Sequence, residues 1–423
     1  MPVRVEVSVP NVKQLCVVMI SVLLLLPLSS YGQERLSLTL GDALARAREQ
    51  NPDLLAARQE REGARGRLVK AQYPHQFNPE LGGSGAHRTF AGRPGSSTDF
   101  DITLSQELEV AGQRDKRIKE AEKNLARVSQ QVRDAERLTF AHVKEAFYQS
   151  LYRKRRLALF RDVEALDRRL WEIATSRFQA GDVPKMNVNV AMIRLGQARK
   201  DTIVAERDSQ NTLRTLERLI GLEPTGRLSL VGDLVVTPQA FHEASLLRLA
   251  QENRPDLQTT ALEQQRVAAE IALTRRLIVP NPTVQAFYRR EEGGDKIAGG
   301  AISFPLPLFD RKQAELTQLA GRASQAKYEQ QSTALRIQQE VRDAFRSYET
   351  AQKEVAVFET EVLDRAAENF QLMEIAYREG KIDLLEVVVV QNDLVHAQFS
   401  YVDSLLHYWL ARTALERAVG QDL

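Results

Sequence analysis

Residues 113–180 form an unbroken stretch without a glycine or a proline. These two residues interrupt helices more strongly than any others, so the stretch predicts a single helix over residues 113–179. At 1.5 Å per residue such a helix is about 100 Å long. No compact domain has that depth, so the chain must form an elongated bundle or a tube.

The chain is also a tandem duplication with a period of about 200 residues. Four segments recur in the same order: residues 51–54 at 254–257, residues 143–147 at 341–345, residues 177–181 at 376–380, and residues 219–221 at 418–420. The offset between the copies stays between 198 and 203 positions. We therefore expect a first copy at 33–222, a linker with a strand or two at 223–242, and a second copy at 243–423.

Each copy predicts the same order of elements: a broken helix, two short strands, a long helix, a turn at a glycine and a returning helix. In the first copy these are residues 40–72 with a break at 51–52, 78–90, 98–110, 113–179 and 185–220. In the second copy they are residues 243–277 with a break at 254–255, 282–290, 298–308, 310–378 and 383–419.

The long helices carry an apolar seam with the 3-4 spacing of left-handed coiled coils. Its members are Ile118, Ala121, Leu125, Val128, Val132 and Ala135, and the first four recur 198 positions later as Leu316, Leu319, Ala323 and Ala326. The predicted fold is therefore mainly α, built of long antiparallel coiled-coil helices with a small β part.

The first 32 residues are typical of a secretory signal peptide. Arg4 and Lys13 precede the apolar run 17–26, which leads to Pro27 and the small residues of 29–32. Ten apolar residues are too few to span a bilayer of about 30 Å, so an uncleaved anchor fits less well, as does a buried strand. The only cysteine, Cys16, begins the apolar run. The mature chain is then expected to carry no lipid, disulfide or thiolate metal site.

The strand 98–110 has a half-buried pattern, since Phe100, Ile102 and Leu104 alternate with polar residues. Ile302 and Phe304 repeat it in the second copy. No segment beyond the signal has the length of an apolar membrane helix, so membrane entry would have to use the strands, with these five side chains toward lipid. Four strands cannot close a barrel, which needs about eight, so several copies would have to share one. A soluble β cap on a coiled coil is the alternative.

Other classes of function find little support. The formal charge of +2 and the lack of a basic, aromatic-rich run do not indicate nucleic-acid binding. The six histidines are scattered without metal-ligand spacing, and no phosphate-binding glycine loop occurs. We therefore expect no enzyme, no cofactor and no metal site.

Taken together, the signal segment, the twofold repeat and the glycine-led turn after each long helix resemble the TolC-type outer-membrane efflux channels. Residues 106–117, QELEVAGQRDKR, are most similar to the heavy-metal (cobalt–zinc–cadmium, Czc-type) branch. The resemblance implies a homotrimer in the outer membrane of a Gram-negative bacterium, with a 12-stranded β-barrel and a periplasmic α-barrel. It also implies a periplasmic membrane-fusion adaptor and an inner-membrane pump of the proton-driven RND type. A drug-efflux or type I secretion channel is the alternative within this class, and a periplasmic coiled-coil adaptor or rod is the alternative outside it.

The same resemblance implies a gate at the turns that follow the long helices, where carboxylates ring the constriction. The candidate residues are Gly181, Asp182, Asn187, Gly380, Asp383 and Glu386. Glu386 matches a gate carboxylate of the family, whereas the next expected acid falls on Val389, so the acidic ring is thinner than usual. Alternatively, Asp383 and Glu386 are solvated acids favoured by a helix N-terminus. The two glycines are expected to serve the turns, which require a positive φ.

Overall fold

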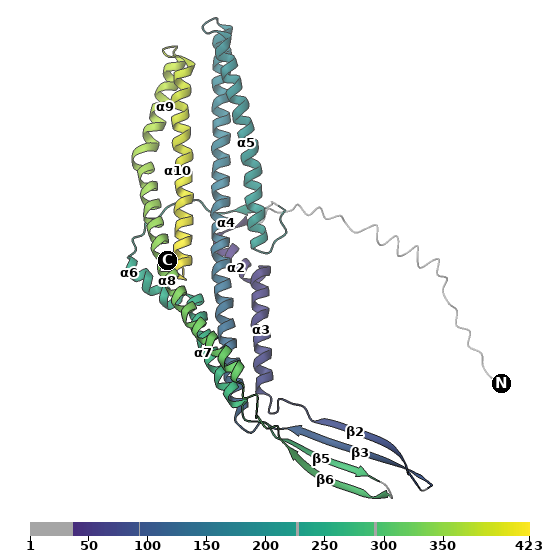
Figure 1. The fold of residues 1–423 in the computed structure, drawn as a ribbon. Coiled ribbons are helices and arrows are strands. Elements are labelled where there is room, and N and C mark those ends of the chain that lie inside the picture. The colour runs from purple at the N-terminus through teal and green to yellow at the C-terminus, as the bar shows by residue number, and fades with distance from the viewer. Residues whose placement is uncertain (1–36, 93, 226–227, 292–293) are drawn as a thin grey trace, which may run out of the picture.

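The structure, a computed structural model, describes residues 37–92, 94–225, 228–291 and 294–423. It is a long rod of helices with a four-stranded sheet at one end (Figure 1). This architecture confirms the predicted fold class of long helices with a small β part. The predicted signal segment, residues 1–32, lies outside the described residues.

The predicted elements occur in the predicted order in both copies, and the structure adds β1, which the sequence did not predict. The first copy contains β1 (Ser37–Leu38), α2 (Leu40–Gln50), α3 (Pro52–Gln72), β2 (Glu80–Thr89), β3 (Ser96–Glu107), α4 (Gln113–Gln179) and α5 (Lys185–Leu219). The connection to the second copy carries β4 (Ser229–Leu230). The second copy contains α6 (Glu243–Asn253), α7 (Pro255–Arg276), β5 (Thr283–Arg290), β6 (Lys296–Ser303), α8 (Gln313–Val357), η2 (Phe358–Val362), α9 (Leu363–Arg378) and α10 (Leu384–Val419). Within the described ranges, no helix is both long and apolar enough to cross a membrane.

The second long helix, predicted as one element over 310–378, is interrupted by the π-helical turn η2. The repeat offset explains the interruption. It is 198 positions up to Phe345, which matches Phe147, and 199 positions from Ala376, which matches Arg177. The second copy therefore has one residue more between these points. A turn with i→i+5 hydrogen bonds takes up that residue and leaves the side chains on either side in register.

The four strands form one antiparallel sheet in the order β2-β3-β5-β6. The fourth strand ends at Ser303, so its predicted extension to residue 308 is wrong and Phe304 lies just beyond it. Pro305 and Pro307 explain the early end, because proline has no backbone N–H to donate to a neighbouring strand. A separate parallel pair joins β1 to β4.

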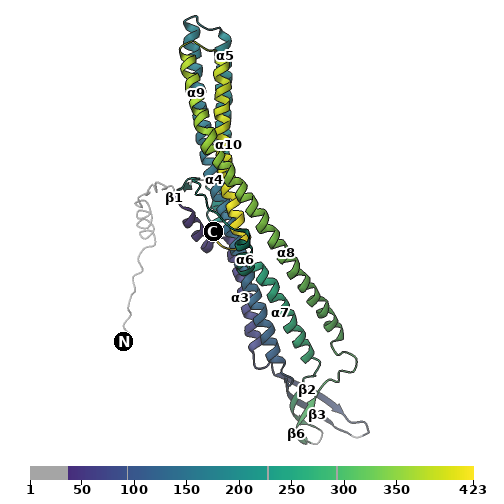
Figure 2. The ribbon, with the colours of Figure 1, turned by 90° about the vertical axis from the view of Figure 1, so that its left-hand side faces the viewer.

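The helices form a wall whose composition changes along the rod. Near the sheet, α3, α4, α7 and α8 lie side by side, and toward the far end α4 is flanked by α5 and α10, with α9 beside α10 (Figures 1 and 2). The largest core lies between, where the aromatic residues of both copies meet. Tyr148 stacks on Trp409 with ring centroids 4.5 Å apart, and the hydroxyls of the buried Tyr348 and Tyr408 lie 3.3 Å apart.

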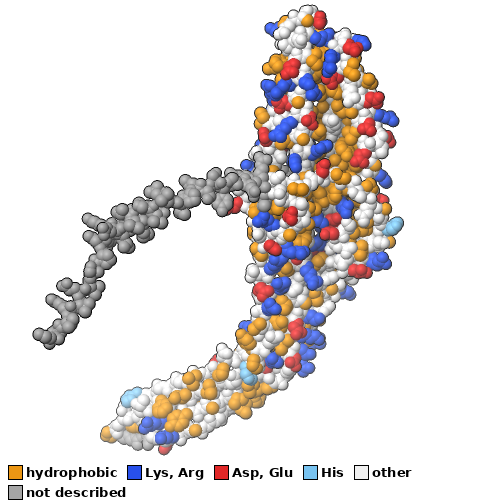
Figure 3. Space-filling view, turned by 180° about the vertical axis from the view of Figure 1, so that it is seen from behind, with side chains coloured by type: hydrophobic (Ala, Val, Ile, Leu, Met, Phe, Trp, Pro, Cys, Tyr) orange, Lys and Arg blue, Asp and Glu red, His pale blue; other side chains and the backbone are white. Residues whose placement is uncertain are grey.

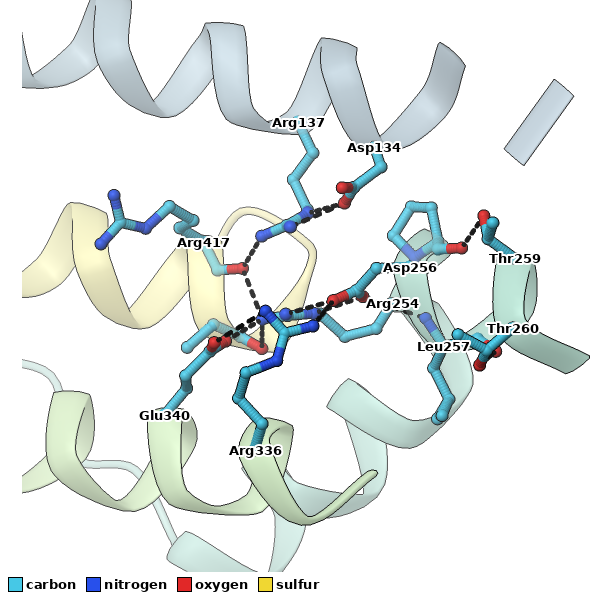
Figure 4. A network of polar contacts seen from close by, with 12 residues as sticks. Asp134, Arg137, Arg254, Asp256, Leu257, Thr259, Thr260, Arg336, Glu340 and Arg417 are labelled. Atoms are coloured by element: carbon cyan, nitrogen blue, oxygen red, sulfur yellow. Dashed lines mark hydrogen bonds and ion pairs between the residues drawn. The ribbon is translucent and has the colours of Figure 1, made fainter. Parts of the chain in front are cut away.

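The break in each leading helix is bonded to the end of the last helix of the same copy. In the first copy, Asn51 Nδ2 donates to the carbonyl of Leu219 at 2.7 Å. In the second copy the matching residue is Arg254, which is 2% exposed and donates to the carbonyl of Ala418 at 3.0 Å and to Glu340 at 2.8 Å (Figure 4). Burial by itself would lower the pKa of Arg254, but its bonds to Asp256 and Glu340 outweigh burial and raise it.

Candidate functional site: the helical tip

The turns at the far end of the rod have the same backbone hydrogen bonds in both copies. Gly181 and Gly380 have φ of 84° and 74°, which confirms that each turn needs a left-handed residue. The N–H of Asp182 donates to the carbonyl of Arg177 at 2.9 Å, and the N–H of Lys381 donates to that of Ala376 at 2.9 Å. These bonds define a Schellman motif, which ends one helix and lets the next begin a few residues later.

The predicted gate side chains lie at the outer surface of this tip. Asp182, Asp383 and Glu386 are exposed, and Asn187 is half-buried. Asp383 is the N-cap residue of α10, but its side chain makes no capping hydrogen bond. Glu386 lies in the first turn of α10, at the position that Asn187 holds in α5. The structure brings all of them to one end of the molecule, and their role in a gate stays a prediction.

Below the turns, Arg177 of α4 contacts Tyr377 of α9. The guanidinium of Arg177 lies 5.2 Å from the centre of the Tyr377 ring, and its Nη1 donates to the Tyr377 carbonyl at 3.3 Å. Tyr377 is fully buried, and its hydroxyl makes no hydrogen bond with any residue that the structure describes. Burial raises the pKa of this hydroxyl, against the opposite effect of Arg177. The contact therefore fixes the end of the second helical hairpin to the first.

A second polar contact joins the same hairpins farther from the turns. Gln391 of α10 is fully buried, and its Nε2 donates to the buried carboxylate of Asp167 in α4 at 2.8 Å. Arg194 of α5 donates to Gln391 Oε1 at 3.2 Å and lies 3.5 Å from Asp167. We call these five residues, Asp167, Arg177, Arg194, Tyr377 and Gln391, the tip clasp. Sequence reasoning missed them, because the hydrogen bonds between the two hairpins join residues 197–224 positions apart.

At the other end of the rod, four of the five predicted lipid-facing residues share one face of the sheet, and Phe304 lies beyond the end of β6. Ile102 is paired with Tyr288, and Ile302 with Val284, so these side chains project to the same side as Phe100 and Leu104. Ile102, Leu104 and Ile302 are 48%, 51% and 70% exposed. In Figure 3 the sheet, at the lower left, shows mostly apolar and uncharged side chains.

The opposite face of the sheet is charged. Arg88 pairs with Asp99 at 2.8 Å, and Arg289 pairs with Asp101 at 3.5 Å. At the start of α4, Gln113 Nε2 donates to Asn281 Oδ1 at 2.9 Å, and Asn281 donates in turn to Glu107. The polar face therefore continues from the sheet onto one side of the helical wall.

Metal ligation has no visible site here. Among the described residues, no group of three or more His, Cys, Asp or Glu side chains is placed to hold an ion.

Comparison with known proteins agrees with this geometry. The family described as "Outer membrane efflux protein" matches residues 43–222 and 246–421, one range in each copy. The cobalt-zinc-cadmium resistance protein CzcC of Cupriavidus metallidurans is 24% identical over 386 residues, which cover 91% of this chain and 90% of CzcC.

Two solved structures show the same fold. The outer membrane protein VceC of Vibrio cholerae has a TM-score of 0.76 at 18% identity, over 90% of this chain and 96% of VceC. The open state of the MtrE outer membrane channel of Neisseria gonorrhoeae has a TM-score of 0.74 at 17% identity, over 90% of this chain and 89% of MtrE. Because the family match spans most of both copies, this chain belongs to the outer membrane efflux protein family and is placed in the outer membrane, with its helices in the periplasm.

Proposed function

We propose that three copies of this chain close into a passive exit duct of a tripartite efflux system, and that the duct conducts divalent heavy-metal cations. The observation that carries the proposal is a pair of open edges. In the described sheet, β2 and β6 each have a neighbour on one side only. Unpaired strand edges are a liability unless another strand covers them, and a head-to-tail contact that closes gives a ring. Twelve strands from three chains would then form the barrel.

The internal repeat indicates which residues would form the contact between neighbouring chains. Within one chain, Phe160 of α4 packs on Phe399 of α10, with ring centroids 4.6 Å apart. The repeat offset maps Phe160 onto Phe358 of η2 and Phe399 onto Lys200 of α5. If the ring repeats the same packing between chains, Phe358 of one chain lies beside Lys200 of the neighbouring chain. An ammonium group over an aromatic ring is a favourable pair.

A neighbouring contact maps in the same way. Arg156 lies 5.0 Å over the ring of Phe399, and the offset maps Arg156 onto Glu354. Glu354 would therefore also face Lys200 of the neighbouring chain, and the two side chains carry opposite charges. The exposed apolar side chains Met192, Ile193 and Ile203 of α5 lie along the same edge. Both edges thus carry the chemistry of an interface.

Cross-linking tests the ring. The only cysteine is Cys16, in the predicted signal segment, so introduced cysteines report without background. With Lys200→Cys and Phe358→Cys in one chain, a short bismaleimide linker should give covalent trimers from outer membranes. The matched pair Phe160→Cys and Phe399→Cys should link within one chain and leave its mass unchanged. Monomers only from the first pair would reject this assembly.

The tip is the proposed gate and the proposed docking point of a periplasmic adaptor. Three copies of Glu386 would place negative potential at the mouth of the duct, where a wet constriction focuses the field. Opening requires the α9–α10 hairpin to move from the α4–α5 hairpin, so it must break the tip clasp. The pump, proposed to be of the proton-driven RND type, supplies the energy, and the chain itself is proposed to be no enzyme.

The cargo is proposed from the likeness to CzcC, whose name states resistance to cobalt, zinc and cadmium. A deletion strain decides it through its susceptibility to zinc, cobalt, cadmium, copper and silver and to a panel of lipophilic drugs. We expect hypersensitivity that is confined to metals. Sensitivity to drugs alone would be consistent with the proposed duct but would show that its cargo is drugs and not metal cations.

A further inference from the structure

We propose that a groove between α4 and α7, just beyond the sheet, binds the phosphate headgroup of an anionic phospholipid in the inner leaflet of the outer membrane. This inference rests on the proposed function, because it requires the sheet to lie in that membrane. The groove has a volume of about 350 Å³. Lys116, Lys119 and Lys123 line it from α4, and Gln265 and alanines that include Ala268 and Ala272 line it from α7.

The three ammonium groups lack an anionic partner in the described part of the chain. Lys123 Nζ donates to the side-chain oxygen of Gln265 at 2.8 Å. No carboxylate of the described residues pairs with any of the three lysines within 4.0 Å, and this includes Asp115 and Glu122 on the same helix. Three like charges within about two helical turns repel one another, and a bound anion would relieve that repulsion.

On α7 the groove lies away from the ion pairs of the wall, and on α4 its three lysines lie roughly 40–100° around the helix from the ion-paired Glu120. Glu120 lies two turns after Gln113, on the same side of α4 that continues the polar face of the sheet, and it pairs with Arg266 of α7 at 3.3 Å. Arg266 also bonds Glu263 and Glu270.

Ala268 and Ala272 lie roughly 140–180° around α7 from Glu263 and Glu270, at 100° per residue. The groove therefore belongs to the side of the rod that continues the apolar face of the sheet. If that face meets lipid, the groove faces the membrane surface.

The position of the groove along α4 matches the depth at which lipid headgroups lie. Lys116 and Lys123 come three and ten residues after the start of α4 at Gln113, which is about 5 and 15 Å along the helix. The headgroup region of a bilayer extends about 5–8 Å beyond the hydrocarbon on each side, and a lysine side chain can reach across several ångströms to it. Clusters of lysine next to a membrane span attract anionic lipids, while the short alanine side chains leave room for the glycerol part.

Native mass spectrometry of the purified trimer tests the proposal, with phosphatidylglycerol and phosphatidylcholine as the added lipids. We expect the wild type to bind phosphatidylglycerol roughly tenfold or more tightly than phosphatidylcholine. The variant Lys116→Gln/Lys119→Gln/Lys123→Gln should lose this preference. The matched variant Lys185→Gln/Lys327→Gln/Lys353→Gln removes three exposed lysines elsewhere and should keep it.

The outcomes separate the two proposals. An intact trimer in the outer membrane whose groove variant keeps the preference would overturn the lipid site alone. Full displacement of phosphatidylglycerol by millimolar inorganic phosphate would also overturn it, since the groove would then be a plain anion site. Failure of the wild-type chain to form a membrane trimer would instead reject the proposed function.

Discussion

Gly221 and Gly420 end the last helix of each copy, and both have a positive φ, of 74° and 88°. Their surroundings differ in how closely the backbone of the leading helix approaches. A Cβ atom on Gly221 would lie 2.4 Å from the carbonyl oxygen of Gln50, whereas on Gly420 the nearest atoms, of Asn253, would be 3.3 Å away. Gly221 therefore serves both the turn and the close approach, and Gly420 serves mainly the turn.

Gly221→Ala is expected to destabilise the protein more than Gly420→Ala. A left-handed alanine costs about 1–2 kcal/mol at either position, and the first substitution adds an overlap with backbone that cannot move aside easily. Thermal unfolding in detergent, followed by circular dichroism, measures both. Gly63→Ala in α3, where a Cβ meets no atom within 4 Å, is the control and should stabilise slightly. Equal losses at Gly221 and Gly420 would contradict the role of the close approach.

Glu386→Ala should lower the cation preference of the reconstituted duct, by roughly twofold in the permeability ratio, because three carboxylates leave the mouth. Reversal potentials in planar bilayers under a salt gradient measure the ratio. Asn187→Ala at the matching position of the first copy removes no charge and should leave selectivity unchanged. An unchanged ratio in Glu386→Ala would mean that Glu386 has no role in selectivity and is a solvated acid at the start of a helix.

Single residues also mark the limit of what the sequence could predict. The prolines after Asn51 and Arg254 predicted both breaks in the leading helices, and the turn glycines predicted their own conformation. The buried bonds of Arg254 could not be predicted, because its partners Glu340 and Ala418 lie 86 and 164 positions away. The tip clasp stayed hidden for the same reason, since only the packing of the two hairpins brings its members together.

At the scale of elements, the two faces of the sheet predict opposite responses to charge. Ile102→Lys places a charge on the apolar face, where a lysine near the middle of a bilayer costs about 2–4 kcal/mol. We expect a reduced yield of trimers in outer membranes. Thr103→Lys, one residue on and on the polar face, is the matched control and should assemble normally. Equal yields from the two variants would place this sheet outside the membrane.

The turn η2 shows which features of a helix the sequence pattern can predict and which it cannot. The glycine-free pattern predicted a continuous second helix, since nothing in composition marks a π turn. The signal was present as a change of one position in the repeat offset, which indicates an inserted residue but not where a helix will take it up. β6 differs in the same way, because Pro305 marked a strand end that the apolar alternation through Phe304 and Leu306 obscured.

Deleting Thr360 should remove the inserted residue and give a continuous α-helix from α8 into α9, as in the first copy. Since wide turns are weaker than regular ones, we expect slower amide hydrogen exchange over residues 355–363 and an unchanged fold. Hydrogen-exchange mass spectrometry measures this. Deleting Thr333, in α8 before Phe345 and so outside the stretch with the extra residue, shifts the register without relieving a wide turn and should destabilise the trimer. Faster exchange after the Thr360 deletion would contradict the insertion account.

On the scale of the whole molecule, the internal repeat divides the far end of the rod into two hairpins that are joined at the tip clasp. Among the described residues, the matching positions make no such contact: Phe178 corresponds to the buried Tyr377 but is 41% exposed. In a ring of three chains, the neighbouring chain would cover Phe178. The two hairpins are therefore bonded to each other within one chain, and in the proposed trimer the mouth can widen only if these intrachain contacts change.

Arg177→Ala combined with Gln391→Ala should release the clasp and open the tip. Each lost hydrogen bond to a charged group is worth about 1.5–3 kcal/mol, enough to raise a minor open population tenfold or more. Single-channel conductance in planar bilayers should increase, and a host cell should become permeable to large hydrophilic antibiotics. Arg378→Ala removes an exposed ion pair with Glu374 on the same helix, 3.2 Å long, and should change neither. A lower unfolding temperature with unchanged conductance would make the clasp a structural contact only, and the barrier to passage would then have to lie elsewhere along the duct.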